Sequence, residues 1–264
     1  MSYLSAKGIT AGYGRQPVIH DISFQLEEGR LLGVIGANGS GKTTLLKALC
    51  GILPHEGSCT LDGALLEQLS ARQIARLISY IPQRSGVSID ISVLDVVLMG
   101  FNPQLSLLEH PSKAMREAAL QALRQVGLDD RAEENYLHLS EGQKQLCILA
   151  RTLVSDSKLL LLDEPESALD FRFRYQMLSL LREWVSFGKR SAVVTLHDPV
   201  LALNFCDQLL LLDESGILGM LEPRTASLDE MERLLSRVYG DISLQRCQNR
   251  RGENQLVILR EGEA

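Results

Sequence analysis

Residues 36–43 of this chain read GANGSGKT, a glycine-rich segment whose residue types suit the binding of phosphate groups. Glycines allow the backbone to bend so that successive N–H groups converge on a phosphate, and a helix N-terminus adds partial positive charge. Lys42 should reach the β- and γ-phosphates, and the Thr43 hydroxyl should ligate Mg²⁺. The segment is therefore interpreted as a P-loop, the alternative being a glycine-rich turn that binds no ligand. The expected nucleotide-binding residues are Gly36, Asn38, Gly39, Ser40, Gly41, Lys42, Thr43 and Thr44.

Two acidic residues, Asp163 and Glu164, follow the apolar run 159–162 and form the second chemical group. The run reads as a buried strand, and ligands of open α/β sheets collect beyond the carboxyl ends of such strands. Asp163 is suited to hold Mg²⁺, and Glu164 to accept a proton from, or to orient, the attacking water. An acidic pair alone would more often cap a helix. Behind a P-loop, the pair indicates hydrolysis of the γ-phosphate rather than nucleotide storage.

The elements that must position these groups alternate between strands and helices. Residues 31–35 read as a buried strand that leads into the P-loop, and a helix with an apolar face follows it. Later strand-like and helical runs alternate at 159–162, 171–184, 191–195, 201–206 and 209–212. Strands that are apolar on both faces predict a mostly parallel sheet covered by helices.

Three further regions depart from this alternation. Residues 1 to about 30 and the hairpin 57–66 read as antiparallel strands, whereas about 91–154 show helical periodicity. The expected fold is therefore α/β, a P-loop NTPase with a mostly parallel sheet, an antiparallel β subdomain and an inserted α-helical subdomain. We expect a nucleotide-binding domain over 1–240 and a β-containing extension over 241–264. The two helical stripes expected within the insertion are Val93, Val96 and Val97, and then Ala118, Leu120, Ala122, Leu123 and Val126.

The composition of the chain limits the compartments and the classes of partner that are expected. The chain has 264 residues, of which 45% are hydrophobic, enough for a substantial core. Its net charge of −6 argues against a nucleic-acid partner. Its apolar runs fall far short of the roughly 20 residues that cross a bilayer, and its first residues lack the blocks of a secretion signal. The lack of such a signal leads us to expect the cytoplasm, and five cysteines without a Cys-x-x-Cys pair suit reduced, packed thiols.

Residues 139–143 read LSEGQ. This segment indicates which family of phosphate-binding proteins the chain resembles. Ser140 is an apt N-cap with Gln143 at the N3 position, the spacing of a capping box before a helix. The segment resembles the signature of ATP-binding-cassette (ABC) ATPases and precedes Glu164 by the family's spacing. The resemblance implies that Ser140, Glu141, Gly142 and Gln143 contact the ATP held by a partner subunit. A well-capped helix without a ligand is the alternative.

The resemblance extends over nearly the whole chain and implies further roles. Tyr13 matches the aromatic residue that stacks on adenine, and Gln83 the glutamine that touches the metal or water and reports nucleotide state to a membrane partner. Asp170, in the segment 167–170, resembles the D-loop aspartate at the dimer interface, and His197 the switch histidine that contacts the γ-phosphate. Each is weak alone, since a packed aromatic, a solvated amide, a helix cap or a structural histidine would look the same. No guanine-reading Asn-Lys-x-Asp motif is present, which disfavours a GTPase.

Two glutamates depart from the family pattern. The family usually has glycine at the position of Glu141, whose carboxylate could repel a partner's γ-phosphate or could point to solvent. We favour solvent, because the helix N-terminus itself remains intact. Glu166 stands where threonine or serine is common, and the sequence offers no account of its effect.

The resemblance implies a head-to-tail homodimer with ATP and Mg²⁺, in which Glu164, His197 and Gln83 are catalytic and Thr43, Gln83 and Asp163 hold the metal. Residues 75–83 and 92–103 look like the importer ATPases for ferric siderophores, haem and cobalamin, with residues 95–100 facing a polytopic permease. A solute-binding protein would then be an indirect partner, and the chain would lie on the cytoplasmic face of the membrane. The alternatives are a molybdate-type importer ATPase, a soluble ABC ATPase that acts on a protein partner, and a nucleotide sensor without activity.

Overall fold

The computed structural model describes residues 3–14, 16–83, 87–106, 108–167 and 169–260 of the chain. Its centre is a six-stranded sheet in the order β10-β9-β3-β8-β7-β6, in which the five strands from β9 to β6 run parallel and β10 runs antiparallel. The parallel sheet predicted from the doubly apolar strands is confirmed. Its strands are β3 (Leu31–Gly36), β6 (Ile78–Ile81), β7 (Leu159–Asp163), β8 (Ser191–Thr195), β9 (Gln208–Asp213) and β10 (Gly216–Leu221).

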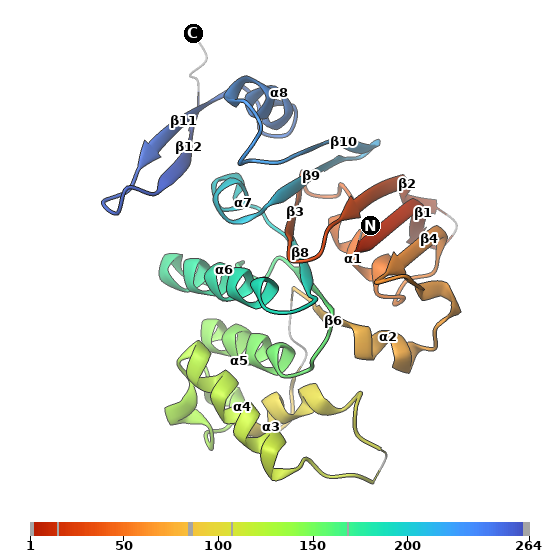
Figure 1. Cartoon of the computed structure of the whole chain (residues 1–264), viewed down its shortest axis with the longest axis vertical. Coiled ribbons are helices and arrows are strands. Elements are labelled where there is room, and N and C mark those ends of the chain that lie inside the picture. The colour runs from red at the N-terminus through yellow and green to blue at the C-terminus, as the bar shows by residue number, and fades with distance from the viewer. Residues whose placement is uncertain (1–2, 15, 84–86, 107, 168, 261–264) are drawn as a thin grey trace.

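The predicted antiparallel strands form a second sheet in the order β2-β1-β4-β5. Figure 1 shows this sheet on one side of the central sheet, together with α1, whereas α5, α6 and α7 lie on the other side. The hairpin expected at 57–66 is present and begins two residues earlier. The four strands are β1 (Leu4–Tyr13), β2 (Gln16–Leu26), β4 (His55–Leu61) and β5 (Ala64–Leu65).

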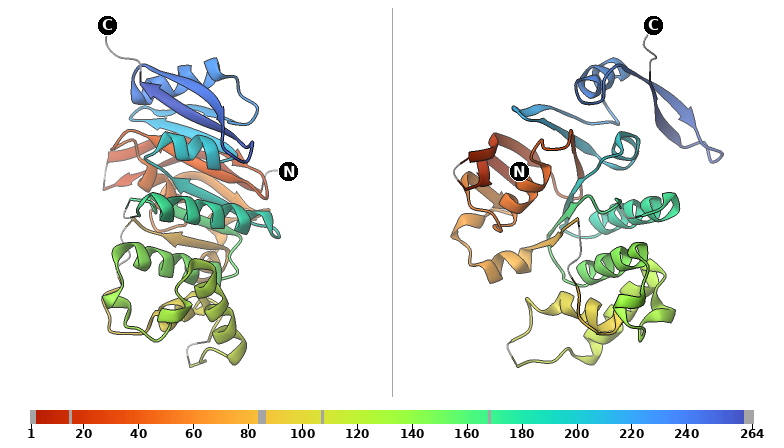
Figure 2. Two further views of the ribbon diagram at one scale, coloured as in Figure 1. Left: turned by 90° about the vertical axis from the view of Figure 1, so that its left-hand side faces the viewer. Right: turned by 180° about the vertical axis from the view of Figure 1, so that it is seen from behind.

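The helices cover both faces of the central sheet, and the predicted helical region forms a group beyond β6 (Figure 2). The α-helices are α1 (Lys42–Leu49), α2 (Ala71–Leu77), α3 (Val93–Leu98), α4 (Lys113–Val126), α5 (Glu141–Leu153), α6 (Phe171–Ser186), α7 (Pro199–Phe205) and α8 (Leu228–Tyr239). The short 3-10 turns are η1 (Leu66–Gln68), η2 (Met99–Phe101), η3 (Asp129–Arg131) and η4 (Tyr136–His138). Among the helices of the described segments, none combines the length and the apolar content that a bilayer crossing requires.

The predicted stripe on α4 was wrong at one position. Ala118 is exposed and Ala119 is buried, and Leu120 is only partly buried. Since adjacent helical residues point about 100° apart, Ala119 rather than Ala118 lies on the buried face with Ala122, Leu123 and Val126. Val93, Val96 and Val97 on α3 are fully buried, as predicted.

The two faces of β7 pack into two different hydrophobic cores. Leu160 and Leu162 pack with the helices α3 to α6, whereas Leu159 and Leu161 pack with α1 and the antiparallel sheet. All four side chains are fully buried. Because successive strand residues point to opposite faces, an uninterrupted leucine run is what a strand covered on both sides requires.

A two-stranded hairpin, β11 (Ile242–Gln248) with β12 (Asn254–Arg260), ends the described chain. The sequence pattern predicts a polar turn at 249–252 and a strand at 256–259, which the turn and β12 confirm, but it does not predict β11. Asn204 of α7 anchors the hairpin, because its Nδ2 donates to Leu256 O and its Oδ1 accepts from Leu256 N, each at 2.8 Å. The division into 1–240 with a helical subdomain at 91–154 and an extension at 241–264 remains our proposal.

Candidate functional site

The expected site residues gather at the carboxyl ends of four neighbouring parallel strands. In the order β3-β8-β7-β6, these ends lead into the P-loop, His197, Glu164 and Gln83, respectively. Parallel strands present their carboxyl ends at one edge of a sheet, so this strand order alone brings the four segments together. The candidate site therefore lies at the carboxyl edge of the buried central sheet.

The P-loop connects the fully buried strand β3 to α1 through left-handed backbone. Gly39 has φ 87° and Gly41 has φ 90°, values that favour glycine. Gly41 is the N-cap of α1, so the first N–H groups of the helix point into the loop without partners inside the helix. Ser40 is 2% exposed, and its Oγ is buried without a hydrogen-bond partner in the described part of the chain. A buried unpaired hydroxyl beside free N–H groups fits an anionic ligand with several acceptor atoms.

Lys42, the first residue of α1, folds back over the P-loop. Its Nζ donates to Gly36 O at 2.9 Å and to Ala37 O at 3.2 Å, and the side chain is only 6% exposed. Burial lowers the pKa of Lys42, and the nearby carboxylates, Glu164 foremost, act in the opposite direction. Carbonyl oxygens are weaker partners for an ammonium group than phosphate oxygens, so this cation is placed to exchange one for the other.

Thr43 and Asp163, both expected to hold Mg²⁺, are brought together. Thr43 Oγ1 donates to Asp163 Oδ1 at 3.0 Å across 120 residues of sequence. Asp163 is 1% exposed and also accepts from Thr195 Oγ1 at 3.1 Å and from Tyr80 OH at 3.2 Å. A carboxylate and a hydroxyl are the hard oxygen ligands that Mg²⁺ prefers, so the residues present fit this metal.

Glu164 is held at both carboxylate oxygens. His197 Nε2 lies 2.7 Å from Oε1, and Gln83 Nε2 donates to Oε2 at 2.5 Å. The backbone is fixed as well, because Glu164 N donates to Thr195 Oγ1 at 2.8 Å and φ is 47°. A positive φ in a residue other than glycine is uncommon and often marks a functional position. The three residues expected to be catalytic thus meet at one carboxylate.

Sequence reasoning missed Thr195 and Tyr80, which both contact Asp163. Thr195 pairs with Asp163 in the register of β8 with β7, so the hydroxyl stands directly beside the carboxylate. The available signal was a polar residue at the carboxyl end of an otherwise apolar strand. For Tyr80, burial raises the pKa well above its usual range, with Asp163 acting in the same direction. Both hydroxyls therefore serve as donors that fix the carboxylate.

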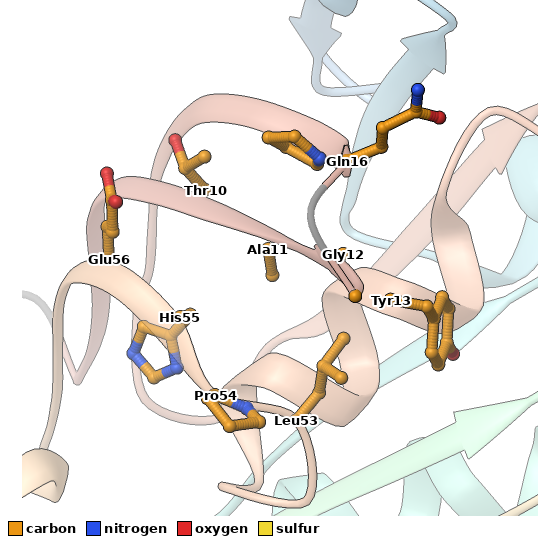
Figure 3. A pocket seen from close by; sticks show the side chains of 11 residues that line it. Thr10, Ala11, Gly12, Tyr13, Gln16, Leu53, Pro54, His55 and Glu56 are labelled. Carbon is orange, nitrogen blue, oxygen red and sulfur yellow. The ribbon is translucent and has the colours of Figure 1, made fainter.

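Tyr13, expected to stack on adenine, lies beside α1. Its ring is 54% exposed, Lys47 Nζ donates to its hydroxyl at 3.2 Å, and the same Nζ lies 5.6 Å from the ring centroid. The ring stands at one end of a cavity of about 560 Å³ that reaches along β1 to Glu56 (Figure 3). An exposed aromatic face next to the helix that follows the P-loop is suited to hold a flat base.

The signature segment forms the capping box that its spacing predicted. Ser140 Oγ accepts from Gln143 N at 3.3 Å, and Gln143 Oε1 accepts from Ser140 N at 2.9 Å. The Glu141 side chain is 73% exposed and pairs with Lys144 Nζ at 2.8 Å, so in the single chain its carboxylate points to solvent. Gln145 Nε2, one turn further on, donates to Gln83 O at 3.3 Å and links α5 to the catalytic cluster.

Asp170, the expected D-loop aspartate, caps α6 by accepting from Phe173 N at 3.0 Å. Ala168 in the same segment lies outside the described residues. Leu169 packs beside the signature helix, since a Cβ added at Gly142 would stand 3.5 Å from Leu169 Cδ2. Asp170, Ser140 and Gly142 do not join the cluster around Glu164, which is the arrangement expected if they act on a second subunit.

The family of the chain follows from comparison with known proteins. The ABC transporter family matches residues 19–167, a span from β2 to the start of the D-loop. The chain is 36% identical to the hemin import ATP-binding protein HmuV of Bordetella pertussis, over 90% of its own length and 92% of that protein. It is 39% identical to the manganese transport system ATP-binding protein MntB of Bacillus subtilis, over 77% of this chain and 80% of that one. The chain belongs to the ABC transporter ATP-binding proteins.

A solved structure extends the likeness to the whole chain. A metal-chelate type ABC transporter in an inward-facing conformation superposes with a TM-score of 0.82 and 29% identity, covering 98% of both chains. The likeness includes the C-terminal hairpin, which lies outside the family match. The chain is thus an ATP-binding cassette with ATPase activity.

Proposed function

We propose that this chain is the ATP-hydrolysing subunit of an importer for a metal chelate such as a ferric siderophore, haem or cobalamin. The observation that carries the hydrolytic part is the convergence of His197 and Gln83 on the two oxygens of Glu164, beside the pair formed by Thr43 and Asp163. The relatives named for hemin and manganese transport support the import of a metal or its chelate.

The residues of the cluster divide the chemical step between them. The P-loop amides and Lys42 bind the triphosphate, and Mg²⁺, held by Thr43, Asp163 and Gln83, would neutralise charge on its β- and γ-phosphate oxygens. Glu164 orients the attacking water and accepts its proton. His197, which lies beside the Oε1 atom of Glu164, contacts the γ-phosphate. The reaction requires mainly positioning and charge stabilisation, which the rigid strand ends supply.

The site is completed by a second copy of the chain in this proposal. Two subunits pair head to tail, so that Ser140 and Gly142 of one cover the ATP bound by Lys42 of the other. The capping box supports this role, because it holds the N-terminus of α5 rigid while the Ser140 hydroxyl hydrogen stays available for a phosphate oxygen. ATP then closes the dimer, and loss of the γ-phosphate contacts reopens it.

The surface proposed to contact the permease is narrower than the segment 95–100 expected from the sequence. Val96, Val97, Leu98 and Gly100 are buried, so only Asp95 and Met99 of this segment offer accessible surface. Both line a groove of about 390 Å³ together with Asn102 and Arg116. We propose that a cytoplasmic segment of the permease occupies this groove, which places the chain at the inner face of the membrane. The solute and its binding protein would not touch this subunit.

Copurification from cells distinguishes this proposal from its alternatives. We expect the chain, solubilised with mild detergent from its own cells, to carry a polytopic membrane protein and to release phosphate from ATP with Mg²⁺. The D95K/M99E variant should lose that partner, whereas K189A, at an exposed lysine elsewhere, should retain it. A complex with a non-membrane protein instead would support the soluble ABC ATPase. ATP binding without phosphate release in the intact complex would support the sensor.

A further inference from the structure

Glu166 is a buried acidic residue to which the reaction described above gives no part. Its side chain is 2% exposed, and Oε1 accepts a hydrogen bond from His197 N at 2.9 Å. The second oxygen, Oε2, is buried and has no hydrogen-bond partner within the described residues. A buried carboxylate with an unpaired oxygen destabilises a fold, and proteins retain such groups mainly at functional sites.

We propose that Glu166 is a positioning residue, which holds the main chain of His197 in place and so sets the reach of its imidazole toward Glu164. The inference rests on the proposed roles of His197 and Glu164. Glu166 does not touch the substrate in this account. It acts through the peptide to which the imidazole is attached.

The backbone around Glu166 ties this contact to the catalytic carboxylate. Glu164 O accepts from Ser167 N at 3.1 Å, and Glu166 O accepts from Leu169 N at 3.0 Å, so residues 164–167 and 169 form a sequence of tight turns. The main chain of Glu166 therefore belongs to the segment that leads to Asp170, whereas its side chain reaches across to the segment after β8. Glu166 therefore adds a link between the segment that carries Glu164 and the segment that carries His197.

Among the described residues, further anchors of this segment lie on the neighbours of His197. Leu196 N donates to Val34 O at 3.1 Å, which ties the end of β8 to β3. Asp198 caps α7 by accepting from Val200 N at 2.8 Å and from Leu201 N at 3.2 Å. The peptide of His197 lies between these two anchors, and Glu166 supplies the bond to its N–H. Without an acceptor there, this peptide could rotate between its anchors and carry the imidazole away from Glu164.

The charge environment agrees with a structural acceptor rather than a reacting group. Burial raises the pKa of Glu166, although the hydrogen bond from His197 lowers it. A neutral carboxyl group keeps the carbonyl-type acceptor that the His197 N–H needs. Glutamine has the same shape and the same acceptor, so it can replace Glu166 in this role, whereas leucine fills the space without an acceptor.

The test compares E166Q and E166L in the full chain, with steady-state phosphate release measured over a range of ATP concentrations in Mg²⁺. We expect E166L to lower kcat about tenfold, the scale of one lost hydrogen bond, with KM for ATP within about twofold of the original. E166Q should keep kcat within about twofold of the original. A purely structural role would instead change thermal stability and ATP binding together, which melting curves and calorimetry would reveal.

The outcomes distinguish this inference from the proposed function. H197A and E164Q, measured in parallel, should both lower phosphate release roughly 100-fold or more. If they do and E166L retains the original kcat, or E166Q falls as far as E166L, the positioning role is overturned and the proposed function stands. If H197A is fully active, the proposed role of the histidine fails, and the inference fails with it. Should E166L not fold, E166A must show the same loss of kcat.

Discussion

His197 Nε2 lies 2.7 Å from Glu164 Oε1, although the two residues follow different strands and are 33 positions apart in the sequence. The contact exists because β7 and β8 are neighbours in register, with Asp163 beside Thr195. Gln83 approaches the other oxygen from β6. The carboxylate proposed to activate water is therefore oriented by groups that follow both adjacent strands.

Replacing Lys42 with alanine should weaken ATP binding. The ammonium group is buried over the P-loop and can exchange the carbonyls of Gly36 and Ala37 for phosphate oxygens. Loss of a charge-assisted bond of about 1.5–3 kcal/mol corresponds to roughly 10–100-fold weaker binding. Calorimetric titration with ATP measures the effect, with K189A as the control for loss of a lysine. Unchanged affinity in K42A would contradict the assignment of the P-loop.

Replacing Glu141 with glycine should leave ATPase activity equal or higher. The carboxylate is 73% exposed, and its pair with Lys144 is a surface contact worth no more than about 1 kcal/mol. The capping box between Ser140 and Gln143 does not involve Glu141 and should survive. E141Q separates the effect of charge from that of size. A large loss of phosphate release in both variants would mean that the carboxylate has a role in the closed dimer.

The fold could be predicted from the sequence where side-chain pattern and burial coincide. The leucines at 159–162 are buried on both faces, and the P-loop strand is buried throughout. Strand β11 was missed because its sequence, ISLQRCQ, carries polar side chains that are mostly exposed. One position of the α4 stripe was wrong because Ala118 and Ala119 are chemically identical.

The sequence predicted only those site residues that lie within recognisable motifs. The contacts of Tyr80, Thr195 and Glu166 depend on the strand order β3-β8-β7-β6 and on register, which no local pattern specifies. A resemblance to a family implies roles only for the residues that match the motifs of that family. The resemblance implies no role for Glu166.

The stability of the protein should depend on pH through Glu166. Its ordinary pKa is 4.5, and burial raises the pKa in the folded chain. Above pH 4.5 the unfolded chain therefore loses this proton first, so the free energy of unfolding falls as pH rises toward the folded pKa. E166Q lacks this loss, so its melting temperature should rise relative to that of the original protein as pH rises above 4.5.

Thermal melts without nucleotide measure this difference. E141Q is the matched control, because its exposed carboxylate should produce no difference that grows with pH. If the melting temperatures of E166Q and the original protein differ by the same amount at every pH, Glu166 ionises alike in the folded and unfolded chains.

Replacing Glu164 with glutamine should retain ATP binding and lower phosphate release roughly 100-fold or more, the contribution of a general base. The amide preserves the shape of the side chain between Gln83 and His197 but does not accept a proton. Light scattering should then detect a dimer that forms with ATP and persists. E183Q, at an exposed glutamate on α6, is the control. Hydrolysis at the original rate would remove Glu164 from the mechanism.

The central claim is that Ser140 of one copy completes the ATP site of another. It is tested by mixing S140C chains with N38C chains, both in the E164Q background with Cys50 and Cys247 replaced by serine. Both positions are exposed, and the remaining cysteines are buried. With ATP and a mild oxidant, we predict a disulfide-linked heterodimer of twice the 29.2 kDa chain mass, absent without ATP and absent for R250C in place of S140C. A failure to cross-link while calorimetry shows ATP bound would contradict the account.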